Sequence, residues 1–210
     1  MSLLNQIAEQ LMKGKANDVK ALVEQALAAG ESPAKILNEG MLRGMGIIGE
    51  RFKKNEVYVP EVLIAARAMK AGMQILQPKL TAAGVQALGV AVLGTVKGDL
   101  HDIGKNLVGM MLEGAGFKVI DMGIDVPPEK FLAGAREHKA QVIGVSALLT
   151  TTMTNMKAVV DAVKASDMAG KVKVMIGGAP VTQAFCDEIG AHGYAPDAAS
   201  AADLAKSLLK

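Results

Sequence analysis

The chain has 210 residues, of which 50% are hydrophobic and 21% are charged, and its formal net charge is only +2. This composition predicts a folded protein of one large domain or two small ones, because so many apolar residues can fill substantial cores. Aromatic residues make up 3% and tryptophan is absent, which argues against stacking surfaces for single-stranded nucleic acid. A nucleic-acid partner is therefore not expected.

Up to about Leu80 the sequence has the periodicity of amphipathic helices, and four helices are expected. The residues that predict their starts are Ser2, Asn17 or Asp18, Ser32 with Pro33, and Pro60, while Gly30 predicts a stop. These features predict a four-helix bundle over residues 1–86. The third helix is rich in glycine, which requires the close approach of either a second helix or a flat ligand.

The segment Gln77–Gln86, which contains Pro78 and Gly84, is the predicted linker and the candidate hinge between two domains. Beyond it, short apolar runs alternate with amphipathic segments. Strands are predicted at Leu88–Leu93, Lys118–Met122, Gln141–Ser146, Val172–Ile176 and near Tyr194, each followed by a helix. This alternation predicts an α/β fold, with a Rossmann-like (flavodoxin-like) parallel five-stranded sheet over residues 87–210. Ligands of such sheets bind at the carboxyl ends of the strands, so the loops after the first, third and fourth strands are expected to share one edge.

The loop after the first strand reads Gly98-Asp99-Leu100-His101-Asp102-Ile103-Gly104 and contains the pattern Asp-x-His-x-x-Gly. Histidine can ligate a transition metal through one ring nitrogen while the other donates a hydrogen bond to a carboxylate. Two residues apart on an extended loop, Asp99 and His101 can point to the same side. The alternative is that Asp99 is a helix cap and His101 an ordinary exposed imidazole.

The loops after the third and fourth strands carry the other unusual residues of the predicted sheet. Ser146 opens a segment rich in hydroxyl groups that by itself predicts only a helix cap. Gly177-Gly178 leave room for the backbone to touch a ligand, but they lack the spacing of a phosphate-binding loop. His192, ahead of the fifth strand, is either a solvated loop residue or a contact at the rim of a cofactor site.

With these loops together, the sequence resembles the cobalamin-binding module of methionine synthase. It resembles more closely the small corrinoid proteins of methanol, methylamine and methoxy-aromatic methyltransferase systems, over nearly the whole chain. The motifs that carry the resemblance are Gly98 to Gly104, Ser146-x-Leu148, Gly177-Gly178, and, in the N-terminal half, Gly44-Met45, Gly49, Phe52 and Val59-Pro60.

The resemblance implies a cobalamin or related cobamide, whose own base is displaced and whose cobalt is ligated from below by His101. It implies that Asp99 accepts the other ring N–H, and that Thr152, where methionine-synthase modules usually have serine, hydrogen-bonds Asp99. As a hypothesis, Asp99→Asn leaves the cofactor bound but changes the rates of methyl transfer or reduction. The implied cofactor positions are Gly98, Asp99, His101, Asp102, Gly104, Ser146, Leu148, Thr150, Gly177, Gly178 and Ala198, with Phe52, Val59, Val62 and Leu63 of the helical cap domain.

The function implied is that of a corrinoid methyl carrier in one-carbon metabolism, a subunit rather than a complete enzyme. Its implied partners are a donor-specific methyltransferase, an acceptor methyltransferase that uses tetrahydrofolate or a thiol, and a reductive activation protein. The methyl donor stays open among methanol, methylamines, methoxy-aromatics and betaines. The alternatives are a cobalamin-dependent sensor or regulator, the small subunit of a cobalamin-dependent mutase, and a flavodoxin-like domain without a cofactor.

A cytoplasmic location is expected. The longest apolar stretch, Leu88–Val96, is too short to span a membrane, and the N-terminus lacks the pattern of a signal peptide. The single cysteine, Cys186, excludes an intramolecular disulfide and agrees with a reducing compartment.

Overall fold

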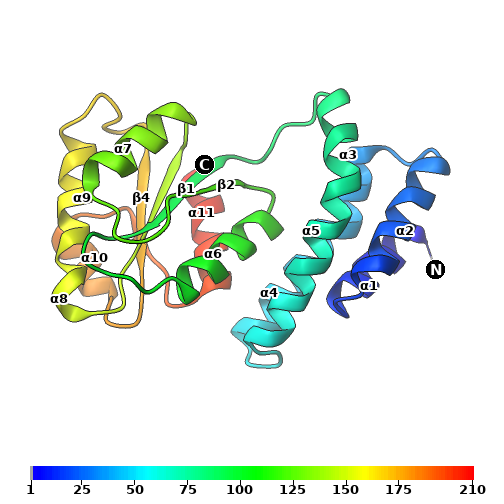
Figure 1. Cartoon of the computed structure of the whole chain (residues 1–210), viewed down its shortest axis with the longest axis horizontal. Helices are drawn as coiled ribbons and strands as arrows, with labels where there is room; N and C mark the ends of the chain where they lie inside the picture. Colours follow the sequence, from blue (N-terminus) through cyan, green and yellow to red (C-terminus); the bar gives the residue numbers. More distant parts are fainter. Residues whose placement is uncertain (1) are drawn as a thin grey trace. The chain divides into compact units, whose positions relative to one another are not determined.

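The computed structural model describes residues 2–210 and divides into two compact units (Figure 1). The helical unit consists of the residues up to Ala87 together with Gly114–Gly116, and the sheet unit of Leu88–Glu113 and Phe117–Lys210. No helix in the described range is both long enough and apolar enough to cross a membrane.

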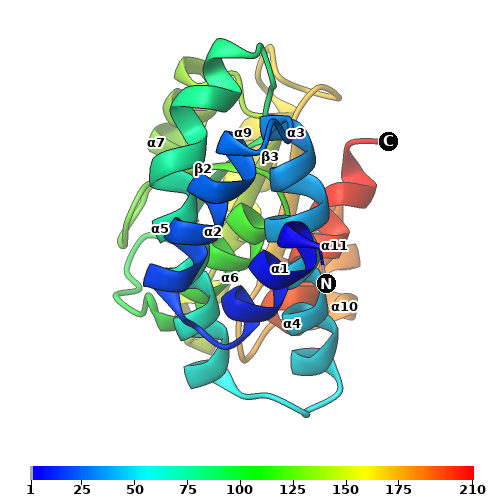
Figure 2. The same cartoon turned by 90° about the vertical axis from the view of Figure 1, so that its right-hand side faces the viewer.

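The helical unit contains α1 (Leu3–Met12), α2 (Ala16–Ala28), α3 (Pro33–Lys35), the π-helix η1 (Ile36–Leu42), α4 (Arg43–Lys53) and α5 (Val59–Ala82). Figure 2 looks onto these helices. Ser2 and Ser32 cap their helices as predicted, since their hydroxyls accept the N–H groups of Asn5 and Lys35. The prediction that Asn17 or Asp18 caps the second helix is wrong. That helix begins earlier, because the Lys15 carbonyl already accepts the N–H of Val19, and no side chain caps it.

The glycine-rich third helix is a continuous run, α3–η1–α4, in which seven residues have π-helical geometry. Two of its glycines face α1. A Cβ atom on Gly40 would lie 3.1 Å from the side chain of Ile7, and one on Gly44 would lie 3.1 Å from the carbonyl oxygen of Ala8. At these two positions, the close approach is therefore that of a second helix.

The predicted linker is wrong in its first half, because α5 continues through Pro78 to Ala82 and only residues 83–89 connect it to the first strand. A proline inside a helix removes one backbone hydrogen bond, here to the carbonyl of Gln74, and is usually a breaker. In α5 the turns on either side keep the helix together, and the Thr81 hydroxyl adds a bond to the Gln77 carbonyl at 3.0 Å.

The sheet unit confirms the predicted fold class. Its strands are β1 (Val90–Thr95), β2 (Lys118–Asp121), β3 (Val142–Ser146), β4 (Lys173–Gly177) and β5 (Gly193–Tyr194), all parallel, in the order β2-β1-β3-β4-β5. Its helices are α6 (Ile103–Gly114), α7 (Pro128–Glu137), α8 (Thr150–Met153), α9 (Asn155–Lys164), α10 (Gln183–Ile189) and α11 (Ala198–Leu208). Helices α7 and α9 cover one face of the sheet, and α6 and α11 cover the other (Figure 1).

The strand register brings the predicted loops to one edge. Thr95 pairs with Ser146, and Ser146 pairs with Gly177, so β1, β3 and β4 end at the same level. The strand order reverses between β1 and β3, and in doubly wound sheets ligands bind at this switch point. At the end of β4 only glycine fits at position 178, because a Cβ atom there would lie 1.8 Å from the carbonyl oxygen of Ala147 and φ is +134°.

Candidate functional site

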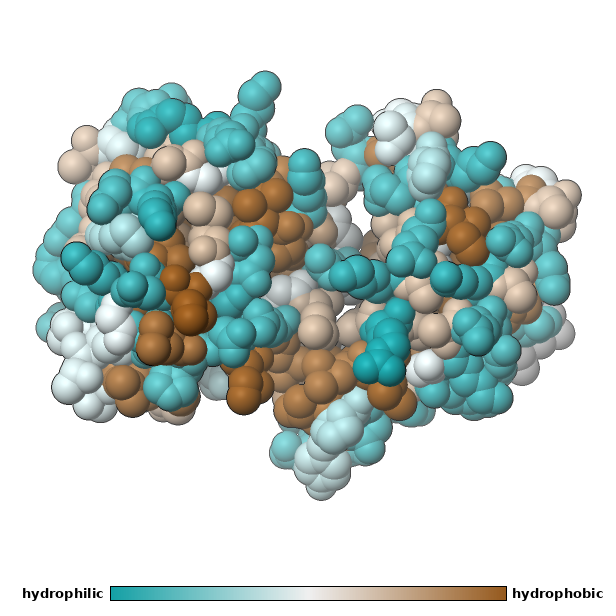
Figure 3. Space-filling view, in the orientation of Figure 1, coloured by the Kyte–Doolittle hydropathy of each residue, from teal (hydrophilic) through white to brown (hydrophobic). Residues whose placement is uncertain are grey.

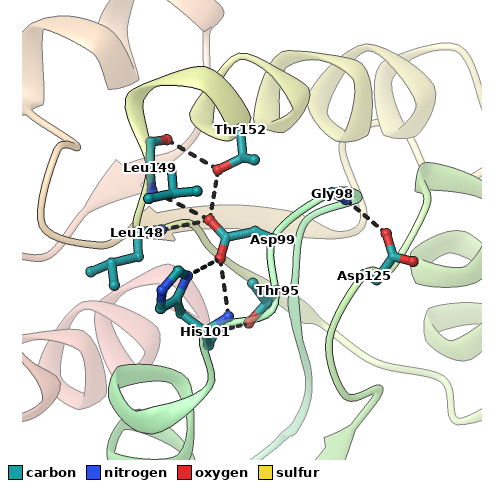
Figure 4. Close-up of polar contacts among 8 residues, drawn as sticks. All are labelled: Thr95, Gly98, Asp99, His101, Asp125, Leu148, Leu149 and Thr152. Carbon is teal, nitrogen blue, oxygen red and sulfur yellow. Dashed lines mark hydrogen bonds and ion pairs between the residues drawn. The ribbon is translucent and has the colours of Figure 1, made fainter.

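The carboxylate of Asp99 is fully buried in the loop after β1 and lies at the centre of a polar cluster (Figure 4). Its Oδ1 atom accepts the backbone N–H of His101 at 3.1 Å and lies 2.8 Å from Nδ1 of the same residue. Its Oδ2 atom accepts the Thr152 hydroxyl at 2.6 Å and the backbone N–H groups of Leu148 and Leu149 at 2.8 and 3.3 Å. The cluster thus joins the loop after β1 to the segment after β3.

Burial by itself would raise the pKa of Asp99, because a carboxylate loses hydration inside the protein. The hydrogen bonds from Thr152, Leu148 and His101 outweigh this effect and hold the pKa of Asp99 well below its ordinary range. Asp99 is therefore an anion at neutral pH and can only accept hydrogen bonds.

The ionised carboxylate fixes the tautomer of His101. Because Oδ1 of Asp99 can only accept, the hydrogen of a neutral imidazole lies on Nδ1, and the lone pair lies on Nε2. The side chain of His101 is 50% exposed while that of Asp99 is 0% exposed, so the ring is anchored at one nitrogen and accessible around the other. The Thr95 hydroxyl holds the loop as well, by donating to the carbonyl oxygen of His101 at 2.8 Å.

Thr152 is buried and lies within reach of two acceptors, the Asp99 carboxylate and the carbonyl oxygen of Leu149 at 3.1 Å. A hydroxyl group has one hydrogen, and the shorter distance with the charged acceptor assigns it to Asp99. The methyl group of Thr152 lies 3.7 Å from the place that a Cβ atom on Gly98 would take. A threonine is therefore accommodated without displacing the hydroxyl.

The other positions implied in the sheet unit lie at the same end of the sheet. Ser146 and Gly177 end β3 and β4, Thr150 and Ala198 begin α8 and α11, and Asp102 directly precedes α6. Gly104, in the first turn of α6, is exposed, and a Cβ placed on it would have no atom within 4 Å apart from its own helix backbone. This absence of close neighbours leaves space there for a ligand.

Sequence reasoning missed two residues that hold the His101 loop. Thr95, at the end of β1, bonds the His101 carbonyl, and Asp125, in the loop after β2, accepts the N–H of Gly98 at 2.7 Å. The only signal for Asp125 was its place in the turn-like stretch Gly123 to Pro127. Nothing in its spacing from His101 pointed to a contact.

On the helical unit, the implied cap residues differ in accessibility. Val62 is buried and Phe52 is partly buried, whereas Val59 and Leu63 are exposed beside Tyr58 and Ile64. Exposed apolar side chains also lie around the His101 loop, namely Leu100, Ile103, Leu148 and Leu149. Brown areas in Figure 3 show that apolar side chains reach the surface of both units. Exposed apolar groups of this kind are typical of ligand or protein contact surfaces.

His192 is exposed, as expected for a loop residue, but it also has a structural role that neither reading anticipated. The Nδ1 atom of His192 accepts the backbone N–H of Val174 at 3.0 Å, and the backbone N–H of His192 donates to the carbonyl of Val174 at 2.8 Å. His192 therefore extends the pairing of β4 and β5 at the amino end of the sheet, opposite the edge that holds His101. Partial burial is the main cause that lowers the pKa of His192, and the positive charges of the nearby Lys173 and Lys164 lower it further.

The donor set at His101 fits a metal that brings most of its own ligands. Among residues 2–210 no group of three or more His, Cys, Asp or Glu side chains is arranged to hold a metal ion. A single accessible imidazole with a carboxylate behind it suits one axial position of a metal held in a macrocycle. The exposed apolar side chains around the imidazole suit the flat face of such a ring.

Comparison with known proteins agrees with this reading. Residues 89–203 match the family model of the B12 binding domain, and residues 3–77 match a second B12 binding domain model. The chain is 45% identical over 208 residues to dimethylamine corrinoid protein 1 of Methanosarcina mazei, covering 99% of this chain and 96% of that protein. It is 40% identical over 212 residues to a corrinoid protein of Desulfitobacterium hafniense, covering 100% of this chain and 98% of that protein.

Solved structures give the same result at the level of the fold. A chain in the methanol:cobalamin methyltransferase complex of Methanosarcina barkeri matches with a TM-score of 0.88 and 31% identity, over 99% of this chain and 79% of that one. A cobalamin-binding protein of Desulfitobacterium hafniense matches with a TM-score of 0.82 and 31% identity, over 99% and 98% of the two chains. The chain therefore belongs to the family of B12-binding corrinoid proteins.

Proposed function

We propose that this protein is a corrinoid methyl carrier that binds cobalamin, or a related cobamide, with His101 as the lower axial ligand. Once bound, the corrinoid would supply the group-transfer chemistry of a carrier that serves two partner enzymes, and the residues of this chain would hold and orient it. The observation that carries the proposal is the contact of His101 Nδ1 with the buried Asp99 carboxylate at 2.8 Å. This contact leaves the lone pair of Nε2 on the accessible side of the ring.

The role of Asp99 is to select the tautomer and direction of the imidazole and to increase its strength as a ligand. The role of Thr152 is to keep the carboxylate in place from the other side, together with the N–H groups of Leu148 and Leu149. Five hydrogen-bonding contacts on one buried side chain give the ring little freedom to turn away. The protein thus prepares the axial ligand before the cofactor arrives.

The displaced nucleotide tail of the cofactor is proposed to lie at the edge of the sheet where β3 ends in Ser146 and β4 ends in Gly177. Support comes from the register, which places these two residues side by side, and from the glycine at position 178, where a side chain does not fit. Gly98 would line the channel of the same tail, and Gly104 would lie along the corrin. Asp102, Leu148, Thr150 and Ala198, which flank this edge, are proposed to complete the contacts.

The exposed apolar residues of the helical unit, Val59 and Leu63 with Tyr58, are proposed to exclude water from the reactive face of the cofactor. Phe52 and Val62, which are more buried, would support them from within that unit. Residues 83–89 are then the connection at which the helical unit would have to move for a partner enzyme to reach the methyl group.

The proposed partners are a donor-specific methyltransferase, an acceptor methyltransferase and a reductive activation protein. The relatives support the first of these, since they include dimethylamine corrinoid proteins and a chain from a methanol:cobalamin methyltransferase complex. The acceptor, tetrahydrofolate or a thiol, and the activation protein follow from the chemistry of a carrier, which must pass its methyl group on and recover after oxidation.

The test is the absorption spectrum of the chain reconstituted with hydroxocobalamin. The wild-type protein is expected to bind the cofactor and to show coordination by imidazole in place of the cofactor's own base, and His101→Ala to lose that coordination. His138→Ala is the matched control, because His138 lies at the far end of α7. A spectrum that is the same for wild type and His101→Ala would refute the proposal.

A second test asks whether the cofactor occupies the space beside Gly104, independently of whether His101 ligates its metal. Gly104→Ala is expected to leave the free energy of unfolding unchanged or slightly higher, because alanine is the better helix former and meets no atom. If the corrin edge passes Gly104, the same variant binds hydroxocobalamin several times more weakly. Unchanged affinity would remove Gly104 from the proposed contact set.

A further inference from the structure

The loop that carries His101 is held on two sides, and only one of them is the cluster around Asp99. On the other side lies the loop between β2 and α7, residues 122–127. The N–H of Thr95 donates to the carbonyl of Gly123 at 3.0 Å, and the N–H of Val126 returns to the carbonyl of Thr95 at 2.9 Å. These bonds join the last residue of β1 to the loop that follows β2, and so continue the pairing past the end of β2.

Asp125 is the residue of this loop that reaches the His101 loop twice. Its backbone N–H donates to the carbonyl of Asp99 at 3.1 Å, and its Oδ1 atom accepts the N–H of Gly98 at 2.7 Å. The two bonds fix both sides of the peptide segment from Gly98 to Asp99. Figure 4 shows the carboxylate of Asp125 directed at Gly98, away from the hydrogen bonds that Thr152 and His101 make with Asp99.

The backbone of Asp125 has a φ of +53°, a left-handed conformation that side chains other than those of Asn and Asp rarely adopt. Such a conformation costs free energy and persists where the surroundings hold it in place. Asp125 makes both of its bonds in this conformation, to Gly98 through its side chain and to Asp99 through its backbone. These two bonds are among the surroundings that hold the left-handed backbone in place.

The start of the β2–α7 loop is fixed by an ion pair with a buried lysine. Lys105 lies on α6, four residues after His101, and its ammonium group contacts both carboxylate oxygens of Asp121 at the end of β2. Asp121 in turn accepts the N–H of Gly123 at 2.9 Å. The chain on each side of His101 is thus tied to the same neighbouring loop.

From this arrangement we propose that Asp125 is a positioning residue for His101, an inference that rests on the proposed function. Gly98 has a φ of +84° and, as a glycine, has more backbone freedom than its neighbours in the loop. The bond to Asp125 removes that freedom, and thereby sets the direction in which the next residue, Asp99, presents its carboxylate to the ring. Without the bond, the N–H of Gly98 has lost its acceptor, and the peptide that precedes Asp99 can rotate more freely.

Three substitutions of Asp125 separate its possible contributions. Asp125→Asn keeps an oxygen acceptor for Gly98 and tolerates a left-handed backbone. Asp125→Ala loses the acceptor and is strained. Asp125→Gly loses the acceptor but relieves the strain. Glu129→Ala is the matched control, because Glu129 is an exposed carboxylate in the first turn of α7.

Two measurements report the outcome. In the cofactor-free protein, the amide of Gly98 is expected to exchange its hydrogen about fivefold to tenfold faster in Asp125→Ala and Asp125→Gly, the usual effect of one lost hydrogen bond. In the protein reconstituted with hydroxocobalamin, the ratio of imidazole-coordinated to uncoordinated cofactor is expected to fall about fivefold in the same two variants. Asp125→Asn and Glu129→Ala are expected to stay within about twofold of wild type in both measurements, since neither removes that bond.

The proposal is overturned if Asp125→Ala has wild-type exchange at Gly98 or wild-type coordination. It is also overturned if Asp125→Gly restores coordination, which would make backbone strain the cause, or if Asp125→Asn is as damaging as Asp125→Ala, which would make the charge the cause. A wild-type protein without imidazole coordination refutes the proposed function itself. Coordination that is present in wild type and unchanged in Asp125→Ala refutes only the role of Asp125.

Discussion

Replacing Asp99 by asparagine tests the hydrogen-bond cluster most directly, because the change keeps the shape of the side chain and removes one of its two acceptor oxygens. In the native cluster Oδ1 faces the backbone N–H and Nδ1 of His101, at 3.1 and 2.8 Å. The Oδ2 atom faces the N–H groups of Leu148 and Leu149 and the hydroxyl of Thr152, at 2.8, 3.3 and 2.6 Å. An amide cannot satisfy both sides.

If the oxygen of the introduced amide faced Leu148, its NH₂ group would face His101. The backbone N–H of His101 would lose its acceptor, and the ring could avoid a clash only by moving its hydrogen from Nδ1 to Nε2. That tautomer has no lone pair for a metal on the accessible side. If the amide turned the other way, the N–H groups of Leu148 and Leu149 would both face a donor.

Either orientation leaves at least one buried N–H group without an acceptor, at a cost of about 1–3 kcal/mol, and turns the remaining bonds to a charged acceptor into weaker neutral ones. We therefore expect Asp99→Asn to lower the free energy of unfolding of the cofactor-free protein by about 2–4 kcal/mol, a large part of the stability of an ordinary domain. Urea denaturation followed by circular dichroism measures this change.

The matched control is Asp161→Asn, since Asp161 is exposed and pairs with Lys157 one helical turn away. Its cost is expected to be no more than about 0.5 kcal/mol. In the reconstituted protein, Asp99→Asn is expected to keep some cofactor and to lose most of the imidazole coordination. An unfolding free energy within about 0.5 kcal/mol of wild type, with an unchanged absorption spectrum, would refute the reasoning about buried acceptors.

Three further changes have definite expected outcomes. Gly178→Ala places a Cβ atom 1.8 Å from the carbonyl oxygen of Ala147, so it should lower the free energy of unfolding by about 3 kcal/mol or more, and a urea midpoint like that of wild type would contradict the close contact. Pro78→Ala restores a helical hydrogen bond inside α5 and should raise the free energy of unfolding by about 1–3 kcal/mol, whereas no change is expected if this segment were a flexible linker. Because the pKa of His192 is lowered on folding, its neutral form contributes stability that is present above the ordinary pKa of about 6.5 and is lost as the pH falls below it. His192→Asn keeps an acceptor for Val174 and should therefore lose less stability than wild type between about pH 7 and 5, by less than about 1 kcal/mol because the residue is only partly buried. Equal losses in urea titrations would show that His192 does not contribute.

Much of the fold could be predicted from local sequence, because periodicity and helix capping act over a few residues. The alternation of apolar runs and amphipathic segments predicted all five strands to within a few residues, and Ser2 and Ser32 marked helix starts. The prediction failed at the end of the fourth helix. Pro78 is a helix breaker by itself, yet α5 continues through it.

The pairing of Asp99 with His101 could be predicted for the same reason, since both residues belong to one short loop and their spacing limits where they can point. The contact with Thr152 was predicted only by resemblance to a family, because 53 residues separate it from Asp99. Methionine-synthase modules usually have serine at the position of Thr152, and the sequence could not show whether the added methyl group of threonine fits. The structure shows that it does, beside Gly98.

Sequence thus predicted which residues could ligate a metal, and it predicted the edge of the sheet on which the structure places them. Tertiary structure alone decided what else holds them there: Asp125 contacts the His101 loop because β2 pairs with β1 and brings the following loop alongside. It also decided the place of His192, which pairs β4 with β5 at the far end of the sheet. The physical reason is that a hydrogen bond between distant residues depends on strand order and register, and these are set by the packing of the whole domain rather than by the residues that make the bond.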